Sequence, residues 1–453
     1  MFELRLSELA QSLGVGCQNG DTAMTGLAID SRAVKPGDLF VAIDGDRVDG
    51  HDFIDSALEN GAAAIACTRS IEIDAPHVQT ADSQHVCATF GRLMRERFHG
   101  AVIGITGSAG KTTAKSFLES ICSGVGATVA TLGNQNNELG VPLTLARLST
   151  NPEFAVVEMG ASQKGDITYL KSMATPQIVV LLNALEAHIG RFGSMETIVD
   201  TKGEILDDLT VRDTAVINAD QSHYSAWRMR AAPARIISFG ENAAADVRLV
   251  DRNDRGFDGS DIWVDVRGTV ISLCLSIPGK GGATNALAAI AAATALDIDL
   301  SLIAQGIEAL SPVEGRGNTL RLDRGIRLID DSYNASPSSV MAALDTLKQA
   351  RPPRTAVLAD MLELGDDGPG YHRDVGRHLS DLGIERVIAV GELSAHIADN
   401  CASRALHFAN TDQLLADCPE FFQDETILVK GSRGMQLDRF VTSMTSSAGE
   451  ATC

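Results

Sequence analysis

The stretch with the clearest chemistry covers residues 101–115, AVIGITGSAGKTTAK. An apolar run, then glycines, then Lys-Thr-Thr predicts a buried strand, a tight turn and the N-terminus of a helix. Glycines let the N–H groups of such a turn converge on phosphate oxygens, and a helix N-terminus favours anions. We therefore expect Lys111 to reach the β- and γ-phosphates of a nucleoside triphosphate. Thr112 is expected to bind Mg²⁺ through its hydroxyl.

This loop departs from the strict P-loop pattern. Ile105 stands where the pattern has its first glycine, and the nearest glycines are Gly104 and Gly107, so the loop is a GxxGKT variant. The alternative is a glycine-rich turn that binds no nucleotide, but the strand before it and the helix after it favour a phosphate site. The loop alone does not specify a reaction.

Three further residues could act beside such a loop. Glu158 ends the apolar segment 154–160, and a carboxylate at a strand end can bind the Mg²⁺ of a phosphate loop. A buried carboxylate without a cation would be costly, which favours the metal role. His188 follows the apolar run 178–182, and a structural role and a ligand role both remain open for it. The pattern around Lys202 indicates only a helix lysine exposed to solvent.

Two polar loops of the first hundred residues follow predicted strands. Residues 30–32 follow a strand that begins at position 26, and residues 45–51 follow the strand 39–43. Ligands of α/β units usually bind at such strand ends. The pattern leaves open whether the two loops bind a ligand or are merely solvated.

A further alternation of strands and helices begins near Pro312. Strands are predicted at 326–331, 355–359, 386–390 and 426–429, with helical patterns between them. Polar residues at or just after their ends are Asp331, Asn334, Asp360, Lys430 and Arg433. This pattern favours a second parallel sheet with helices on its faces, similar to a Rossmann domain.

The composition excludes some partners. Lysine and arginine total 38 against 59 aspartates and glutamates, a formal net charge of −21. Such a chain is not expected to bind nucleic acid or anionic membranes through a general electrostatic attraction. It must therefore bind phosphates through local features, such as helix termini, a few basic side chains and Mg²⁺.

The cysteines and apolar runs point to the cytoplasm. The eight cysteines are scattered without a CxxC or Cys/His cluster, so neither a zinc site nor a disulfide framework is indicated. The first 14 residues carry charges throughout and lack a signal-peptide core. No run reaches the roughly 20 apolar residues of a membrane span. The most apolar segment, 286–296, is alanine-rich and predicts a buried helix.

Together these patterns predict an α/β protein of three domains. We expect a small substrate-binding α/β domain over residues 1–98 and a central ATPase-like domain with a parallel sheet over 99–312. A Rossmann-like domain is expected over 313–453.

The order of motifs resembles the Mur ligases over nearly the whole chain. The motifs are DSRAVKPGDLFVAIDGDRVDGHDF, GITGSAGKTT, NQNNELGVPLTL, VVEMG, NALEAHIGRFGSMETIVDTKGEI, NALAA, GRGN, IDDSYNASPSSVMAALDTL, VLADMLELGDDGPGYHRDVG and VKGSRGMQLDRFV. The phosphate loop alone is not specific to this family, whereas the full set in this order is.

This resemblance implies an ATP-dependent amide ligase of peptidoglycan precursor synthesis. The stretches IDDSYNASP and ADMLELG favour the member that adds D-Ala-D-Ala to UDP-MurNAc-tripeptide. ATP would convert the terminal carboxylate of the tripeptide into an acyl phosphate, which the amine of the dipeptide attacks to give an amide and phosphate. Catalysis would then rest on positioning and charge neutralisation. The resemblance also implies a monomer whose third domain closes onto ATP.

The resemblance assigns roles by position. The triphosphate would lie against Gly107, Ser108, Ala109, Gly110, Lys111, Thr112 and Thr113, with Asn285 at the adenine and Arg316 and Asp331 at the phosphates and ribose. The ligands of two Mg²⁺ ions would be Thr112, Glu158, His188 and Lys202, with Lys202 carrying a carbamate derived from CO₂. The catalytic residues would be Lys111, His188 and Lys202. The UDP-sugar and peptides would contact Ser31, Arg32, Gly45, Arg47, Asp49, Gly50, His51, Asn334, Lys430 and Arg433.

Two departures from the family pattern are visible. Gly281 and Gly282 stand where members usually have His-Asn, which affects the expected adenine contacts, and Ala359 replaces a common glycine. Two alternatives remain: a related ligase that adds another amino acid, or glutamate to folate, and a nucleotide-dependent switch or scaffold without turnover. The second alternative is disfavoured because all five expected active-site residues are present: Lys111, Thr112, Glu158, His188 and Lys202.

Overall fold

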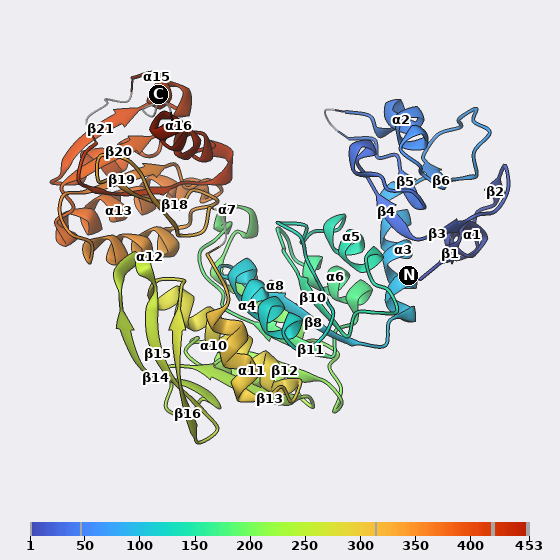
Figure 1. Cartoon of the computed structure of the whole chain (residues 1–453), viewed down its shortest axis with the longest axis horizontal. Helices are drawn as coiled ribbons and strands as arrows, with labels where there is room; N and C mark the ends of the chain where they lie inside the picture. Colours follow the sequence, from blue (N-terminus) through green and yellow to red (C-terminus); the bar gives the residue numbers. More distant parts are fainter. Residues whose placement is uncertain (1, 46–47, 313–314, 418–421, 450–453) are drawn as a thin grey trace.

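The computed structural model describes residues 2–45, 48–312, 315–417 and 422–449, which fold into three lobes (Figure 1). The central lobe lies between the N-terminal lobe, on the right of Figure 1, and the C-terminal lobe at the upper left. Each lobe contains its own sheet and buried apolar cluster. The predicted three-domain α/β class is confirmed.

The N-terminal lobe contains a five-stranded sheet in the order β2-β7-β6-β5-β4 and a small pair, β1-β3. Its elements are β1 (Leu4–Arg5), α1 (Leu6–Leu13), β2 (Cys17–Gln18), β3 (Ala23–Met24), β4 (Gly26–Ala28), β5 (Asp38–Val41), α2 (Ile54–Glu59), β6 (Ala64–Cys67), β7 (His77–Gln79) and α3 (Ser83–Arg97). Strands β4 and β5 are parallel neighbours. The loops 30–32 and 45–51, which follow them, therefore emerge at the same edge of the sheet.

The central lobe is built on a nine-stranded sheet in the order β16-β15-β14-β13-β12-β11-β8-β10-β9. Its elements are β8 (Ala101–Thr106), α4 (Lys111–Ser123), β9 (Thr128–Ala130), α5 (Gly140–Ala146), β10 (Phe154–Glu158), α6 (Asp166–Ala174), β11 (Ile178–Leu181), α7 (Ile189–Phe192), α8 (Met195–Gly203), β12 (Thr214–Asn218), α9 (Tyr224–Arg230), β13 (Arg235–Gly240), β14 (Val247–Asp254), β15 (Ser260–Val266), β16 (Thr269–Leu275), α10 (Gly279–Ala295) and α11 (Leu300–Glu308). The antiparallel strands β14, β15 and β16 extend the parallel sheet because β14 pairs with β13.

Strand β8 lies at the point where the order of the sheet reverses. It pairs with β11 on one side and β10 on the other. The loop after β8 therefore opens into the crevice at the carboxyl edge, where ligands of open α/β sheets bind. In this register Glu158 of β10 is the partner of Ile105, so its carboxylate ends beside the loop.

Helix α10 covers one face of this sheet. Residues 286–293 are all buried in a cluster that includes Phe117 of α4 and Ile237 of β13. Alanine has no side-chain rotamers to lose and little bulk, so a helix rich in it can pack tightly on both neighbours. The predicted buried helix is confirmed.

The C-terminal lobe has a six-stranded sheet in the order β17-β18-β22-β19-β20-β21, parallel except for β17. Its elements are β17 (Asn318–Arg321), β18 (Arg327–Asp331), α12 (Pro337–Lys348), β19 (Arg354–Ala359), α13 (Gly368–Leu382), β20 (Arg386–Val390), α14 (Ala395–Asp399), β21 (Arg404–Phe408), α15 (Thr411–Asp417), β22 (Thr426–Lys430) and α16 (Asp438–Gly449). The four predicted strands are all present. The two that the sequence did not predict, β17 and β21, are the edge strands.

A buried arginine ties the first lobe to the second. Arg95, near the end of α3, donates to the carbonyl oxygens of Ala174 at 2.7 Å, Thr175 at 3.0 Å and Phe98 at 3.0 Å. Burial lowers the pKa of the Arg95 guanidinium. The three carbonyls offset this cost, since they satisfy the donors of a side chain taken out of water.

Replacing Arg95 with methionine is expected to lower the free energy of unfolding by about 2–4 kcal/mol, because three carbonyl groups, two of them in buried hydrogen bonds, lose their donor. Urea unfolding followed by circular dichroism measures this change. Arg92→Met on the same helix, where the side chain is exposed, is the control and should leave the midpoint almost unchanged. Equal midpoints for both variants would contradict the role of Arg95.

Candidate active site

The phosphate loop has the expected geometry. Gly110 precedes α4 with φ at +83°, in the left-handed region that favours glycine. A Cβ on Gly110 would lie 2.3 Å from Oδ1 of Asn285, so the side chain of Asn285 on α10 lies against the loop. The free N–H groups at the start of α4 therefore face a space bordered by an amide side chain.

Lys111 folds back over its own loop. Its Nζ donates to the carbonyl oxygens of Gly107 at 2.7 Å and Ser108 at 3.4 Å. Burial lowers the pKa of Lys111, an effect that Glu158 opposes and Arg316 reinforces. An ammonium group that is held by carbonyl dipoles in a partly desolvated site is suited to bind phosphate oxygens.

Glu158 is the centre of a buried polar cluster. Its carboxylate accepts from the hydroxyl of Thr112 at 2.9 Å and from Nδ2 of Asn136 at 2.7 Å. Its backbone N–H donates to the hydroxyl of Thr131 at 3.0 Å. A hydroxyl and a carboxylate at this separation are the hard oxygen donors that Mg²⁺ prefers, so the pair fits a magnesium ion bound jointly with phosphate. The sequence prediction did not include Asn136.

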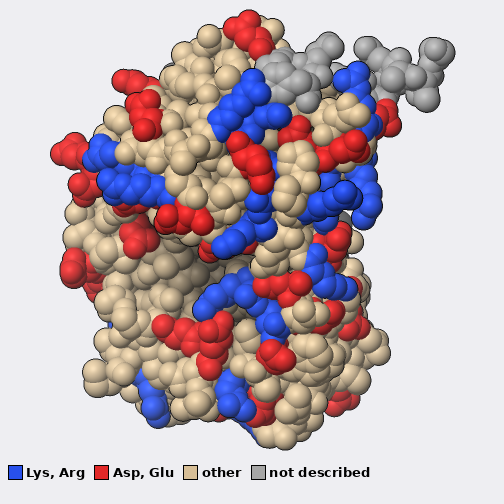
Figure 2. Space-filling view, turned by 90° about the vertical axis from the view of Figure 1, so that its left-hand side faces the viewer, with Lys and Arg blue, Asp and Glu red and all other residues tan. Residues whose placement is uncertain are grey.

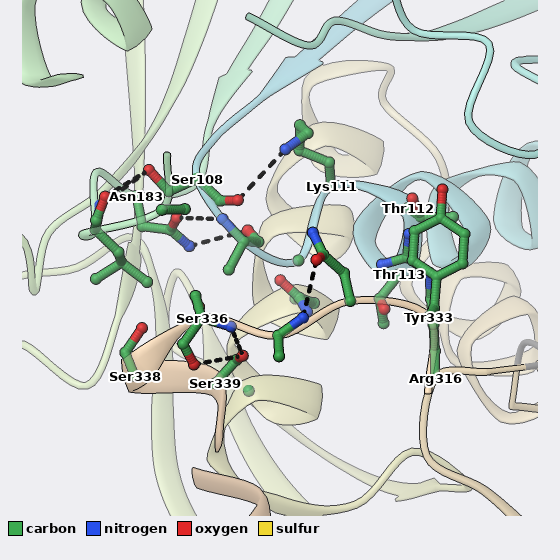
Figure 3. Close-up of a pocket in the computed structure, with 18 of the residues that line it drawn as sticks. Ser108, Lys111, Thr112, Thr113, Asn183, Arg316, Tyr333, Ser336, Ser338 and Ser339 are labelled. Carbon is green, nitrogen blue, oxygen red and sulfur yellow. Dashed lines mark hydrogen bonds between the residues drawn. The ribbon is translucent and has the colours of Figure 1, made fainter. Parts of the chain in front are cut away.

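Asn183 is a second residue that the sequence prediction missed. Its side chain accepts from the N–H of Ala109 at 3.0 Å and donates to the Ala109 carbonyl at 3.1 Å. The hydroxyl of Ser108 donates to the carbonyl of Leu185 at 3.1 Å and accepts from its N–H at 2.9 Å (Figure 3). The segment after β11 thus fixes the shape of the phosphate loop. The signal in the sequence was its position directly after a buried strand.

Lys202 is buried, contrary to what its pattern alone suggested. It is 2% exposed, and Nζ lies 3.4 Å from the Ala161 carbonyl and 5.5 Å from the centre of the Phe192 ring. The ion pairs of the described residues do not include it. Burial, and secondly the positive charge of Lys111, lower the pKa of Lys202 to about 7. A large fraction of this amine is therefore uncharged near neutral pH.

His188 lies at the start of α7, with φ at +60°. Its Nδ1 is hydrogen-bonded to the carboxylate of Glu363, a residue of the C-terminal lobe. Both side chains line the cavity described below. His188 is therefore placed where the central and C-terminal lobes meet.

The C-terminal lobe contributes a group of charged and aromatic residues. Arg316 stacks on the ring of Tyr333 at 4.1 Å, and Arg433 approaches the same ring at 5.9 Å. Lys430 pairs with Asp331 at 2.6 Å and donates to the Asn334 carbonyl at 3.1 Å. Two guanidinium groups on one aromatic ring form a cationic surface. Tyr333 was not among the predicted residues.

One cavity of about 1030 Å³ joins these groups. Its lining includes, from the central lobe, Ser108, Ala109, Gly110, Lys111, Thr112, Thr113, Glu158, His188, Lys202 and Asn285, and from the C-terminal lobe, Arg316, Asp331, Asn334, Lys430 and Arg433. Figure 3 shows Arg316 and Tyr333 on one side of this space and Ser108 and Asn183 on another. The structure thus brings together residues up to about three hundred positions apart in the sequence. Gly281 and Gly282 also line it, where the family pattern has His-Asn.

The predicted residues of the N-terminal lobe do not line this cavity. Arg32 is exposed and forms an ion pair with Asp30 at 2.7 Å. His51 is buried, with Nδ1 at 2.6 Å from Asp49 and Nε2 accepting from the N–H of Thr68 at 3.1 Å. The buried histidine therefore stabilises the conformation of its loop through these hydrogen bonds. Asp49 also pairs with Arg69 at 2.7 Å.

The other residues of these loops are held by the backbone. Ser31 is buried and its carbonyl accepts from Asn60, while the N–H groups of Gly45 and Gly50 donate to Val48 and Ile43. A Cβ on Gly50 would lie 2.6 Å from the Ile43 nitrogen, so this glycine permits a close turn. Arg47 lies outside the described residues.

The described residues hold no cluster of three His, Cys, Asp or Glu side chains suited to a metal. A magnesium ion at Thr112 and Glu158 would thus need ligands from a bound phosphate. Among the described helices, none has both the length and the apolar character needed to cross a bilayer. Basic and acidic side chains are interspersed on the face that Figure 2 presents. There, the net charge of −21 is not gathered into one acidic block.

The fold and the cavity define a multidomain nucleotide-dependent enzyme, and comparison with known proteins gives its family. The Mur ligase family, catalytic domain, matches residues 23–97, the Mur ligase middle domain matches 105–293, and the Mur ligase, glutamate ligase domain, matches 315–433. The chain belongs to the Mur ligase family. This confirms the resemblance seen in the motifs.

Individual relatives match over almost their full length. UDP-N-acetylmuramoyl-tripeptide–D-alanyl-D-alanine ligase of Escherichia coli is 33% identical over 98% of this chain and 99% of its own. The structure of MurF from Acinetobacter baumannii has a TM-score of 0.91 and 29% identity, covering 98% of this chain and 99% of that chain. MurF ligase from Thermotoga maritima in complex with ADP has a TM-score of 0.81 and 28% identity, over 94% and 98%.

Proposed function

We propose that this chain is a MurF-type ligase that joins D-alanyl-D-alanine to UDP-MurNAc-tripeptide, with the conversion of ATP into ADP and phosphate. The observation that carries the proposal is the cavity that unites a phosphate loop with a cationic group from the C-terminal lobe. The full-length similarity to the ligase of Escherichia coli supports the choice of substrates. The product would be UDP-MurNAc-pentapeptide, a precursor of peptidoglycan made in the cytoplasm, where ATP is available.

The residues of the central lobe would bind ATP. Gly107 and the loop from Ser108 to Thr113 would surround the phosphates with N–H groups, and Lys111 would neutralise the β- and γ-phosphates. Asn285 would lie near the base or ribose, next to Gly110. Mg²⁺ bound at Thr112 and Glu158, with a second ion near His188, would supply charge neutralisation to the transferring phosphoryl group.

Lys202 would carry a carbamate. Its uncharged amine attacks the carbon of CO₂, a proton leaves the nitrogen, and the side chain changes from a cation to an anion. The pKa of about 7 and the absence of an ion-pair partner in the described part of the chain support this assignment. A carbamate at Lys202 would add oxygen donors of the kind that Mg²⁺ prefers.

The C-terminal lobe would complete the site. Arg316 and Asp331 would contact the phosphates and the ribose, while Asn334, Lys430 and Arg433 would bind the peptide and the dipeptide. The UDP-sugar would bind the loops that contain Ser31, Arg32, Gly45, Arg47, Asp49, Gly50 and His51, with His51 acting through the shape of its loop. The domains proposed for these tasks are residues 1–98, 99–312 and 313–453.

No protein nucleophile is required in this scheme. The γ-phosphoryl group passes from ATP to the tripeptide carboxylate, which gives an acyl phosphate and ADP. The dipeptide amine then attacks the carbonyl carbon, loses a proton, and expels phosphate. The chain's own residues hold the reacting atoms in line and balance their negative charge.

The test is mass spectrometry of the product. The purified chain, supplied with UDP-MurNAc-tripeptide, D-Ala-D-Ala, ATP, Mg²⁺ and bicarbonate, is expected to form the pentapeptide with one ADP and one phosphate per product. Parallel reactions contain D-alanine alone, or a folate with glutamate, and should give no ligated mass. Product in one of these reactions and none with D-Ala-D-Ala would refute the proposal.

A further inference from the structure

Glu363 makes one of the contacts between the central and C-terminal lobes, which also meet where Arg327 pairs with Asp258 at 2.6 Å. Glu363 lies in the loop after β19, and its carboxylate is bonded to the imidazole of His188 and paired with the guanidinium of Arg191. Its backbone carbonyl accepts from the N–H of Gly190 at 2.9 Å. A single residue of one lobe thus contacts three positions of the other, 188, 190 and 191.

Two glycines permit this close approach. A Cβ on Gly190 would lie 2.5 Å from the nitrogen of Gly365 and 2.9 Å from the carbonyl oxygen of Glu363. Gly365 has φ at +64°, and a Cβ there would lie 3.2 Å from Cα of Gly190. The backbones of the two lobes therefore touch at a point that no side chain can enter without separating them.

The loop that carries Glu363 is fixed within its own lobe. The N–H of Met361 donates to Nε2 of buried His372 at 3.0 Å, and the N–H of Leu362 donates to the hydroxyl of Ser432 at 2.9 Å. Leu364 is buried. Glu363 itself has φ at +63°, a conformation uncommon for a residue with a side chain. The backbone that carries this carboxylate is thus fixed by the C-terminal lobe.

We propose that Glu363 is a positioning residue that couples the docking of the C-terminal lobe to the orientation of His188. A carboxylate accepts the hydrogen of Nδ1, which fixes the tautomer of a neutral imidazole and leaves the lone pair on Nε2. Histidines that bind metals are commonly oriented by such a carboxylate. Here the carboxylate comes from another lobe, so His188 is oriented only when the two lobes are docked. This inference rests on the proposed function, because it takes His188 as a ligand of Mg²⁺.

The first test compares Glu363→Gln with Asp366→Asn, which removes one negative charge from an exposed position of the same loop. Glutamine would turn N–H groups towards His188 or Arg191. We expect kcat for ligation to fall about 10–100-fold in Glu363→Gln, the range for loss of a residue that orients a ligand, while KM for ATP changes less than about twofold. Asp366→Asn should match the wild type in both constants.

The second test needs no turnover. Hydrogen exchange of the segment 189–193 reports the bond from Gly190 to Glu363, and ¹⁵N NMR of the His188 imidazole reports its tautomer. We expect exchange to be at least about tenfold faster in Glu363→Gln and in Gly190→Ala, because both disturb the docked state. The Nδ1–H tautomer of His188 should be less populated in Glu363→Gln, because an amide oxygen is a weaker acceptor than a carboxylate and the amide NH₂ group competes for the same position.

The outcomes separate the proposed coupling through Glu363 from the proposed ligase function. Lower kcat with unchanged exchange and unchanged tautomer would overturn the coupling, and so would altered exchange with unchanged kcat. A similar fall of kcat in Asp366→Asn would show that the effect comes from the loss of any negative charge in this loop, not from the contact of Glu363 with His188. If the wild-type chain forms no product, the proposed function is refuted. Hydrogen-exchange protection of the Gly190 amide, and its loss in the variants, still decide whether Glu363 holds the two lobes together at this point.

Discussion

Replacing Lys202 with methionine is expected to abolish ligation and, at the same time, to make the folded chain more stable near neutral pH. Methionine has a similar length and no charge, so it fills the same space beside Phe192 without the cost of a buried ammonium group. It cannot form a carbamate. We expect kcat to fall at least about 10³-fold, comparable to the loss of a principal electrostatic group of an active site.

The gain in stability depends on pH in a defined direction. In the folded chain, burial lowers the pKa of Lys202 to about 7, against an ordinary value of 10.5. Between these two values the unfolded chain binds a proton that the folded chain does not, so this residue makes wild-type stability rise with pH from 7 to 10.5. Below pH 7 the amine is charged in both states, so the full cost of burying its charge lowers the stability of the folded wild type. The methionine variant should therefore exceed the wild type by a few kcal/mol at pH 6.5, and by less at pH 9.5.

Urea unfolding in buffer free of CO₂ at pH 6.5, 8 and 9.5 measures this difference. Lys164→Met is the control, because Lys164 is exposed and paired with Asp200 at 2.6 Å. That variant should show no gain at any of the three pH values and should retain ligation. Equal stability of Lys202→Met and the wild type throughout, or ligation that survives the substitution, would contradict the assignment.

Local patterns were sufficient to predict the elements of the phosphate site. The strand β8, the turn at Gly110 and the start of α4 follow from apolar residues and glycines within 15 positions. Glu158 was predictable because it ends a buried run. The burial of Lys202 was not visible in its helix pattern, since it depends on Phe192 and Ala161, which other segments bring to it.

The sequence could not predict contacts that form between distant segments. Glu363 meets His188 across 175 positions, and Tyr333 stacks on Arg316 only because β17 and β18 form a hairpin that brings their ends together. The edge strands β17 and β21 were missed because half-exposed strands lack the continuous apolar run of buried ones. By contrast, the four buried strands β18, β19, β20 and β22 were predicted, whereas β13 of the central sheet was not, although Ile237 and Phe239 in it are buried.

The second large effect is expected from Lys111→Met. The side chain donates to two loop carbonyls in the free chain, and those carbonyls can bind water once it is removed. The substitution is therefore expected to weaken the interaction with the nucleotide rather than to disrupt the fold. We expect kcat/KM for ATP to fall about 10³-fold, the size found when a preorganised donor to a developing charge is deleted. Release of ADP in a coupled assay measures it.

Lys348→Met, at an exposed position of the last turn of α12, is the control and should match the wild type. If Lys111→Met turned over ATP and both peptides at the normal rate, the proposed role of Lys111 in the mechanism would be wrong. A misfolded variant would be recognised by a lower urea midpoint, whereas the folded variant should not fall below the wild type.

The same variant tests the electrostatic link between the two lysines. The positive charge of Lys111 is the second cause of the lowered pKa of Lys202. Its removal should raise the pKa of Lys202 towards the ordinary value, because one repulsive neighbour is gone. The rise of stability with pH should then begin at a higher pH in Lys111→Met than in the wild type, and should vanish in the double variant with Lys202→Met. An unchanged onset would show that burial alone keeps the amine of Lys202 uncharged, without the help of the phosphate loop.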